Sequence, residues 1–495
     1  MNLGLLLEMA GSTLVGRDAV ADGDVSLTFD ALADTATRFA RRVAAEGADS
    51  VVYCGTNDAS FPVALFGASL AGVPFIPLNY RLGAEQLEPL VRAHPGALLV
   101  AEVLPVVGAD PARTIDRREL VAGAGGDDPD AQVELPGFVD PEDVAVVLYT
   151  SGTSGAPKAA LLRHRHLTAY VLGTVEFAAA EEHQAALVSV PPYHIAGLAN
   201  LLSNLYAGRR IVYLGAFDPQ VWLDTVRDQG ITQAMVVPTM LARVVHHLEG
   251  APADVPSLAT LSYGGSRMPL PVLEQALEAF EGTGFVNAYG LTETSSTIAL
   301  LGPDDHAAAR AGDPVARTRL GSVGKLLPGI EVEVRDELGQ VLPAGEAGLV
   351  FLRGEQVSGE YAGGSVLDDE GWFPTKDRGW VDPDGFLFIE GRADDTIIRG
   401  GENIAPAEIE DVLAGHDAID DVVVVGVPDD EWGQRIAAVV VVRSGASLDV
   451  DAVQAYARVH LRGSKTPELV VFRDELPRTP TGKLLRREVL ADLTS

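Results

Sequence analysis

Apolar and polar residues follow two different rhythms along this chain. Up to about residue 300, short β-branched apolar runs alternate with Ala-rich segments in which apolar residues recur every three or four positions. The first pattern predicts buried strands and the second amphipathic helices, which together favour an α/β fold with mostly parallel sheets flanked by helices. The helices are predicted over 28–46, 61–71, 218–229 and 238–248, and the strands over 51–54, 73–77, 144–148, 231–237, 258–263 and 285–288.

The pattern changes near residue 320. Residues 329–354 show period-2 alternation of apolar and polar positions and a turn at 337–340, which predicts a small antiparallel β subdomain at about 320–393. The last hundred residues return to mixed helix and strand signals and predict a small α+β domain. Its helices are expected over 406–413 and 449–461, and its strands over 422–427, 436–443 and 469–472.

Composition narrows the class of protein. Hydrophobic residues make up 47% of the 495 positions, as in a globular protein, and the net charge of −33 argues against nucleic acid or anionic membranes as partners. No apolar run approaches the ~20 residues of a membrane span, and the first residues lack the basic start of a signal peptide. The single cysteine, Cys54, excludes internal disulfides and cysteine metal clusters. We therefore expect a cytoplasmic enzyme.

A Gly-, Ser- and Thr-rich stretch follows the predicted strand at 144–148. Glycines let successive N–H groups surround an anion, hydroxyls add donors, and Lys158 adds a positive charge. Because Pro157 precedes the lysine and Ala159 follows it, this is not a Walker A loop. The residues predict a phosphate cradle, although they also fit a flexible turn with a solvated lysine. The cradle comprises Thr150, Ser151, Gly152, Thr153, Ser154, Gly155 and Lys158.

Four further segments combine aromatic, hydroxyl and charged residues near predicted strands: 287–294, 371–377, 390–404 and 478–483. In the first of them, an aromatic, a hydroxyl and a carboxylate could stack a base, bind a phosphate and hold a divalent cation. Each segment also has an ordinary structural explanation when it is taken alone. Glu293, for example, could cap a helix that begins near Thr294.

The order of these motifs along the chain favours a functional interpretation over the separate structural ones. TSGTSGAPK, YGLTE, GWFPTKD, GRADD and PTGK follow one another as in the adenylate-forming superfamily, which the whole chain resembles. That superfamily contains acyl-CoA synthetases, firefly-type luciferases and the adenylation domains of peptide synthetases, and the chain is most like an acyl-CoA synthetase. The resemblance implies an AMP-binding domain over 1–393 and a mobile C-terminal domain over 394–495, joined by a hinge at Asp394.

The resemblance also assigns roles to single residues. Lys483, Thr292 and Glu293 match the catalytic positions, and His194 matches a position between the acyl pocket and the thiol tunnel. Glu293 and Thr150 match the magnesium ligands. The nucleotide and CoA contacts are implied for the cradle residues and for Gly265, Ser266, Arg267, Asn287, Ala288, Tyr289, Gly290, Thr292, Asp377, Arg392, Gly400 and Gly401.

The implied reaction uses ATP, Mg²⁺ and coenzyme A. A carboxylic acid is activated to an acyl-adenylate and then transferred to CoA, with release of AMP and pyrophosphate. The segment after His194 carries no acid that could hold a substrate ammonium, which favours an acid without an α-amino group. Two alternatives stay open: a ligase that loads a separate carrier protein, and a catalytically silent nucleotide- or acyl-binding protein.

Two positions depart from the family pattern. Lys376 stands where a glycine usually precedes the ribose-binding aspartate, and Arg267 stands where related synthetases often carry proline. Neither change removes a reactive group, so we interpret both as tuning.

Overall fold

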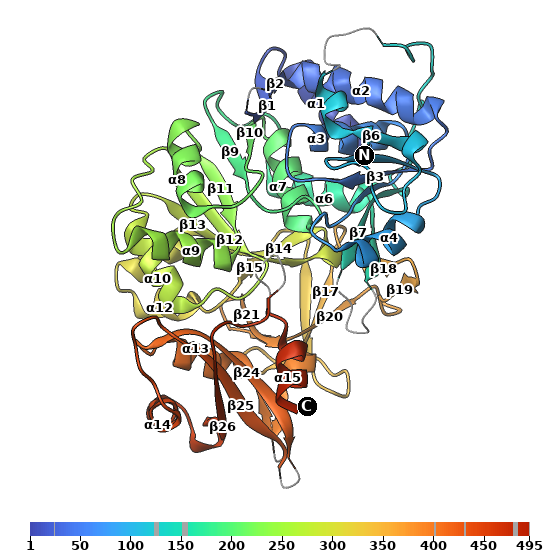
Figure 1. Ribbon diagram of the computed structural model, residues 1–495. Helices are drawn as coiled ribbons and strands as arrows, with labels where there is room; N and C mark the ends of the chain where they lie inside the picture. Colours follow the sequence, from blue (N-terminus) through green and yellow to red (C-terminus); the bar gives the residue numbers. More distant parts are fainter. Residues whose placement is uncertain are drawn as a thin grey trace.

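The computed structural model describes residues 1–23, 25–122, 128–150, 157–399, 402–429, 432–478 and 484–494. A large N-terminal part holds two extended sheets, and the last hundred residues form a smaller part that lies below it in Figure 1. This arrangement confirms the predicted α/β class. No helix within the described ranges is long and apolar enough to span a membrane.

One sheet combines a parallel centre with an antiparallel edge. Its central strands follow buried apolar runs, and both of their faces are covered. Within the described residues the order is β19 (Gly364–Ser365), β18 (Glu360–Tyr361), β8 (Lys158–Arg163), β7 (Val144–Thr150), β4 (Phe75–Pro77), β3 (Ser50–Cys54), β5 (Ala97–Ala101) and β6 (Thr114–Asp116).

The second sheet is longer and changes direction partway. From β1 to β13 the neighbouring strands are parallel except at the β1–β2 edge, and from β13 to β16 they are antiparallel. The antiparallel strands predicted after residue 320 thus extend the large sheet. Within the described residues the order is β16 (Glu331–Arg335), β17 (Gly348–Arg353), β20 (Phe373–Val381), β21 (Phe386–Arg392), β15 (Gly324–Leu326), β14 (Ser296–Leu301), β13 (Gly284–Leu291), β12 (Thr260–Gly264), β11 (Gln233–Val236), β9 (Ala185–Val188), β10 (Arg210–Tyr213), β1 (Asp18–Asp22) and β2 (Val25–Thr28).

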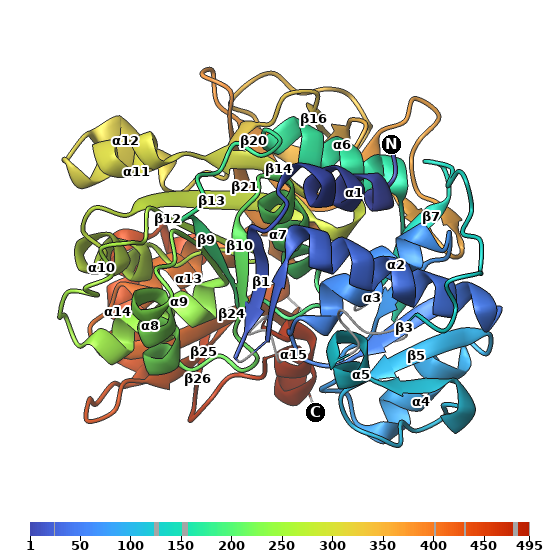
Figure 2. The ribbon, with the colours of Figure 1, turned by 90° about the horizontal axis from the view of Figure 1, so that it is seen from above.

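Helices fill the space between the sheets and cover their outer faces. Successive side chains of a strand point to opposite faces of the sheet and so pack into different hydrophobic cores. In β3, Val51 and Tyr53 pack against the inner helices. Val52 and Cys54 pack on the outer face. The inner helices are α1 (Leu3–Thr13), α2 (Phe29–Ala45), α3 (Ser60–Leu70), α6 (His164–Thr174) and α7 (Ile195–Tyr206). The outer helices are α4 (Ala84–Arg92) on one sheet and α8 (Pro219–Asp228), α9 (Pro238–Leu248) and α10 (Leu270–Ala279) on the other, on opposite sides of Figure 2. Three further helices are α5 (Arg117–Ala122), α11 (Pro303–Arg310) and α12 (Pro314–Arg319).

The C-terminal part has its own core. Its central strands also alternate, so that Val424 packs toward α13 and α14 while Val423 and Val425 pack toward α15. The elements are β22 (Ile397–Arg399), β23 (Glu402–Ile404), α13 (Pro406–Ala414), β24 (Ile419–Asp429), β25 (Gly433–Val442), α14 (Val450–His460), β26 (Leu469–Arg473) and α15 (Arg486–Thr494).

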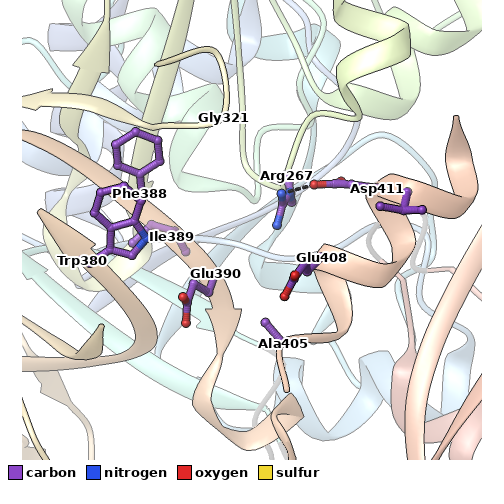
Figure 3. A pocket seen from close by; sticks show the side chains of 10 residues that line it. Arg267, Gly321, Trp380, Phe388, Ile389, Glu390, Ala405, Glu408 and Asp411 are labelled. Atoms are coloured by element: carbon purple, nitrogen blue, oxygen red, sulfur yellow. Dashed lines mark hydrogen bonds and ion pairs between the residues drawn. The ribbon is translucent and has the colours of Figure 1, made fainter. Parts of the chain in front are cut away.

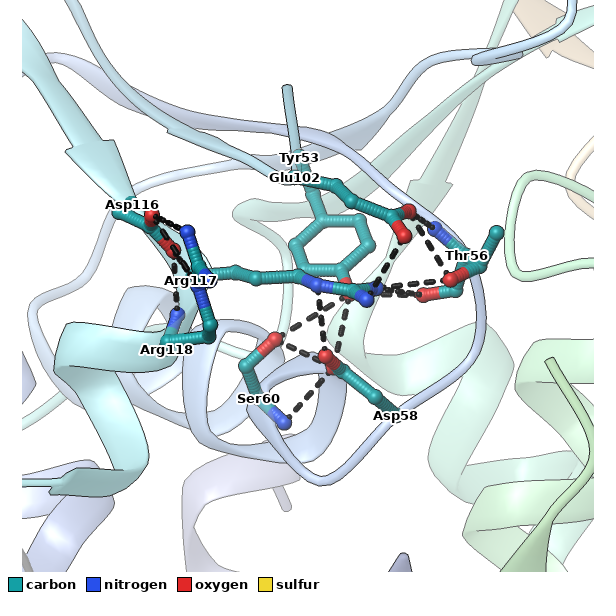
Figure 4. A network of polar contacts seen from close by, with 8 residues as sticks. All are labelled: Tyr53, Thr56, Asp58, Ser60, Glu102, Asp116, Arg117 and Arg118. Atoms are coloured by element: carbon teal, nitrogen blue, oxygen red, sulfur yellow. Dashed lines mark hydrogen bonds and ion pairs between the residues drawn. The ribbon is translucent and has the colours of Figure 1, made fainter. Parts of the chain in front are cut away.

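A buried polar network fixes the loop that follows β3 (Figure 4). The Asp58 carboxylate accepts hydrogen bonds from the Tyr53 hydroxyl at 3.1 Å and from the Ser60 N–H at 2.9 Å, and it pairs with Arg117 at 2.9 Å. Arg117 also reaches Glu102 at 2.8 Å. Ser60 begins α3, Arg117 begins α5, and Glu102 follows β5. The network therefore connects α3 and α5 to the carboxyl edge of the first sheet.

Candidate active site

The predicted phosphate cradle lies in the hairpin between β7 and β8. Thr150 and Lys158 are register partners, and the Thr150 hydroxyl donates to the Lys158 carbonyl at 3.3 Å. The residues between them, Ser151 to Gly155, lie outside the described residues. Lys158 is exposed at the start of β8, with its ammonium 5.8 Å from the centre of the Tyr361 ring. The hairpin therefore presents the lysine at one end of the site.

Glu293 lies in a tight connection between β13 and β14. Residues Thr292–Thr294 form one 3₁₀ turn, which ends at Ser295 in a left-handed conformation with φ 54°. The capping alternative for Glu293 is wrong, because a strand and not a helix follows the turn. The crossing is close: a Cβ on Gly290 would lie 1.8 Å from the Ser296 carbonyl oxygen, so only glycine fits there.

Tyr361 connects Glu293 with the phosphate cradle. Its hydroxyl donates to Oε1 of Glu293, and its backbone pairs with Ala160 of β8. Burial and the acceptor carboxylate raise the pKa of Tyr361, so the phenol keeps its proton and acts as the donor. The Ser358 N–H adds a 2.8 Å hydrogen bond to the Glu293 carbonyl. The segment 358–361 thus contacts Glu293 at both its carboxylate and its backbone carbonyl.

A second cluster forms around Asp377. One of its carboxylate oxygens accepts from the Tyr289 hydroxyl at 2.5 Å, and the other pairs with Arg392 at 3.0 Å. The same Arg392 nitrogen donates to the Thr375 carbonyl at 3.0 Å. Burial lowers the pKa of Arg392, but Asp377 and more weakly Glu293 raise it above its usual value. Tyr289 lies in β13 and Glu293 in the turn that directly follows it, so the two clusters lie at the same end of that strand.

The segment Gly265 to Arg267, which the resemblance implies as a nucleotide contact, follows a strand that pairs with β13. Gly265 follows β12 with φ 84°, and a Cβ on Gly264 would lie 2.2 Å from the carbonyl oxygen of Ala288. Asn287 donates from its side chain to the Ser322 carbonyl at 3.1 Å. The end of β12 is therefore packed tightly against β13. Ser266 and Arg267 are exposed in the loop that follows.

His194 stands at the start of α7. Its carbonyl accepts from the Gly197 and Leu198 N–H groups, and its ring lies 4.5 Å from that of Tyr193, which in turn contacts Tyr80. Burial raises the pKa of Tyr193 to about 12. No acid stands in the first turn of α7, in line with the expected preference for non-amino acids.

The expected hinge directly follows the Asp377 cluster. Asp394 is exposed in the 3₁₀ turn Ala393–Asp395, two positions after Arg392, the last residue of β21. The following strands β22 and β23 pair in antiparallel, but Gly400 and Gly401 between them lie outside the described residues, as does Lys483. The mobility of this joint and the role of Lys483 stay predictions.

The structure brings together Lys158, Glu293, Tyr289, Asp377 and Arg392. Tyr361 and Thr375 complete the site and were missed by the sequence reasoning. Tyr361 carried no local signal, since its role arises from a contact across 68 positions. Thr375 lies inside the GWFPTKD motif, where its hydroxyl accepts from the Asp377 N–H at 3.0 Å, so its closeness to Asp377 was a usable signal.

The donor set fits magnesium held mainly by a polyphosphate. No group of three or more His, Cys, Asp or Glu side chains gathers for a metal among the described residues. Mg²⁺ takes hard oxygen ligands and commonly uses one or two carboxylates plus phosphates and water. Glu293, whose other oxygen already accepts from Tyr361, can supply such a carboxylate.

The departure at Lys376 has a backbone explanation. Lys376 adopts φ 63°, a left-handed conformation in which glycine is unstrained, and its side chain is exposed. We predict that Lys376→Gly raises the free energy of unfolding by up to about 1 kcal/mol, reduced by the greater freedom of glycine in the unfolded chain. Urea denaturation measures this change.

Lys325→Gly is the matched control, because Lys325 is an exposed strand lysine outside the left-handed region. It should lower the free energy of unfolding. Destabilisation of similar size in both variants would contradict the strain at Lys376, and a rise in the KM for ATP in Lys376→Gly would show that the side chain contacts the nucleotide.

Comparison with known proteins identifies the family of this chain. Residues 7–362 match the family described as AMP-binding enzyme, and residues 408–483 match the AMP-binding enzyme C-terminal domain. A feruloyl-CoA synthase from Amycolatopsis sp is 34% identical over 95% of both chains. The fatty acid–[acyl-carrier-protein] ligase ScoC from Streptomyces coeruleorubidus is 33% identical over 94% of this chain and 91% of that protein.

Solved structures give the same result. The O-succinylbenzoate coenzyme A synthetase MenE from Bacillus subtilis, in complex with ATP and magnesium ion, is 28% identical and has a TM-score of 0.84. The match covers 98% of this chain and 99% of that one. With motifs, site geometry and both family domains in agreement, the chain belongs to the AMP-binding, adenylate-forming enzyme family.

Proposed function

We propose that this protein is an ATP-dependent acyl-CoA synthetase that acts on a carboxylic acid with an aromatic ring and no α-amino group. The reaction forms an acyl-adenylate and pyrophosphate, and then acyl-CoA and AMP. The observation that carries the proposal is the Glu293–Tyr361–Lys158 arrangement at the same end of β13 as the Asp377–Arg392 pair, which joins a phosphate end to a ribose end. The acid-free start of α7 supports a non-amino acid.

The ring preference rests on the relatives. The feruloyl-CoA synthase and the O-succinylbenzoate synthetase are both named for acids that contain an aromatic ring. Next to His194, the Tyr193 and Tyr80 rings meet edge to face at 5.7 Å, and such aromatic surfaces favour ring-containing ligands. The similarity to the fatty acid–[acyl-carrier-protein] ligase ScoC supports the alternative in which the acyl group is transferred to a carrier protein. The expected cytoplasmic location stays a prediction.

The residues divide the chemical work. The attacking carboxylate is already ionised near pH 7, so the first step needs no general base. Positive charge is needed where the phosphates approach this anion, and Lys158 and Lys483 are the groups proposed to provide it. Asp377 and Arg392 would orient the ribose, and Tyr361 would fix the Glu293 carboxylate. Magnesium, when bound, neutralises further phosphate charge.

The arrangement of the two domains supports an enzyme poised for the first step. Residues 1–393 are only about four-fifths of the chain, so a TM-score of 0.84 requires the C-terminal domain to be matched as well. The matched neighbour contains ATP and magnesium. We therefore take the observed arrangement as the one used for adenylate formation.

The first prediction tests the function itself. Pyrophosphate release should require an acid, be fastest with arylalkenoic, arylacetic or benzoic acids, and yield acyl-CoA when CoA is present. A panel of aromatic, fatty and amino acids, each tested with CoA and with a phosphopantetheinylated carrier protein, distinguishes the alternatives. A preference for long-chain fatty acids would reject the ring preference, and transfer only to the carrier would reject the CoA assignment. No pyrophosphate release with any acid would favour the silent binding protein.

A second prediction concerns Glu293. Glu293→Gln keeps the shape of the side chain but removes its charge, so we predict an increase of about tenfold or more in the magnesium concentration for half-maximal adenylate formation. A magnesium titration measures this increase. Tyr361→Phe is the matched control, because it removes the hydrogen bond and keeps the carboxylate. Equal magnesium dependence in the wild type and Glu293→Gln would remove Glu293 from the metal site.

A third prediction concerns Lys483. Lys483→Ala should slow adenylate formation by about a hundredfold to a thousandfold, the usual effect of losing one group that stabilises transition-state charge. Thioester formation from a supplied acyl-adenylate should change much less, because the lysine is proposed to act only in the first step. Stopped-flow measurement of each half-reaction separates the two. Equal losses would contradict the assignment.

A further inference from the structure

An ion pair crosses from the N-terminal domain to the C-terminal domain. Arg267, in the loop after β12, donates to the Asp411 carboxylate on α13 (Figure 3). The two side chains are partly exposed, at 43% and 35%. Arg267 lies three positions after Gly264, which packs tightly against β13, so the pair lies at the edge of the candidate nucleotide site.

The surrounding interface is loosely filled. A cavity of about 370 Å³ lies beneath the pair, lined on one side by the stacked Trp380 and Phe388 rings and on the other by the start of α13. An unfilled space contributes few dispersion contacts between the domains. The orientation of the C-terminal domain against this face therefore depends more on the ion pair than it would in a packed interface.

The acids of α13 differ in where their partners come from. Glu408 pairs with Lys465 at 2.5 Å and Glu410 with Arg486 at 2.5 Å, both within the C-terminal domain. Asp411 instead pairs with the N-terminal domain. Burial and the neighbouring acids raise the pKa of Asp411 to about 6, and Arg267 is the charge that lowers it again. The ionised carboxylate of Asp411 is therefore most stable when the domains are in this arrangement.

We propose that Arg267 and Asp411 form a latch that holds the C-terminal domain in the adenylate-forming arrangement and opens for thioester formation. The proposal rests on the proposed two-step function. It makes both residues positioning residues for the first step, and it gives a purpose to the arginine at position 267, where related synthetases often carry proline.

The test measures both half-reactions in Asp411→Asn, which keeps the shape of the side chain. Adenylate formation should slow by about two- to tenfold, as expected for loss of a partly exposed ion pair, while the thioester step from supplied acyl-adenylate stays equal or becomes faster. The exchanged pair Arg267→Asp with Asp411→Arg should recover part of the loss. Glu408→Gln is the matched control, since it removes an acid of the same helix and cavity whose partner is within its own domain.

A second measurement does not depend on activity. Spin labels on Val315→Cys and Val459→Cys, at exposed positions of the two domains, report the distance between them. Cys54 is buried with a pKa raised to about 11, so it does not compete for the label. Asp411→Asn should broaden the distance distribution toward a second population, and Glu408→Gln should not.

The outcomes distinguish the latch from the function. An unchanged distance distribution, equal losses in both half-reactions, or the same effect in Glu408→Gln would overturn the latch while leaving the synthetase assignment intact. Absence of acid-dependent pyrophosphate release in the wild type would overturn the proposed function, and the distance measurement would still test the latch.

Discussion

The pairing of Asp377 with Arg392 is the contact on which the rest of the site depends. It joins neighbouring strands β20 and β21 at their last paired position, and Tyr289 of β13 completes it from a third strand. Since both carboxylate oxygens are engaged and the aspartate is buried, its geometry is fixed before any nucleotide arrives. Arg392 is also the last strand residue before the 3₁₀ turn that contains Asp394. The proposed hinge therefore starts from an immobile point.

The sequence predicted most of the fold because alternation and helical periodicity are local signals. The helix at 238–248 begins and ends as expected, and the turn at 337–340 is closed by an Asp336–Gln340 hydrogen bond of 2.9 Å. The strand at 285–288 runs on to Leu291 because β14 continues to pair with it there, and the motif itself is too polar to reveal this. The continuation of the antiparallel strands into the large sheet was equally hidden, because a pairing partner cannot be found from periodicity.

The site was predictable where a motif carried its own chemistry, and unpredictable where a contact joined distant segments. Asp377 and Arg392 both stand in motifs that the sequence already showed. The sequences around Tyr361 and Asp411 carry no functional motif. Their roles come only from the residues that the fold places next to them. Lys376 shows the reverse case: its departure from glycine was visible in the sequence, but only the backbone angle explains why glycine suits the position.

A rotating domain needs one joint that stays fixed and one contact that can be exchanged. The Asp377–Arg392 pair suits the first role, because its carboxylate is only 6% exposed and leaving a buried charge without its partner is costly. The partly exposed Arg267–Asp411 pair suits the second, because water can replace either partner at small cost. Both pairs lie at the edge of the proposed nucleotide site. Occupancy of the site can therefore bias domain orientation through the weak pair without disturbing the strong one.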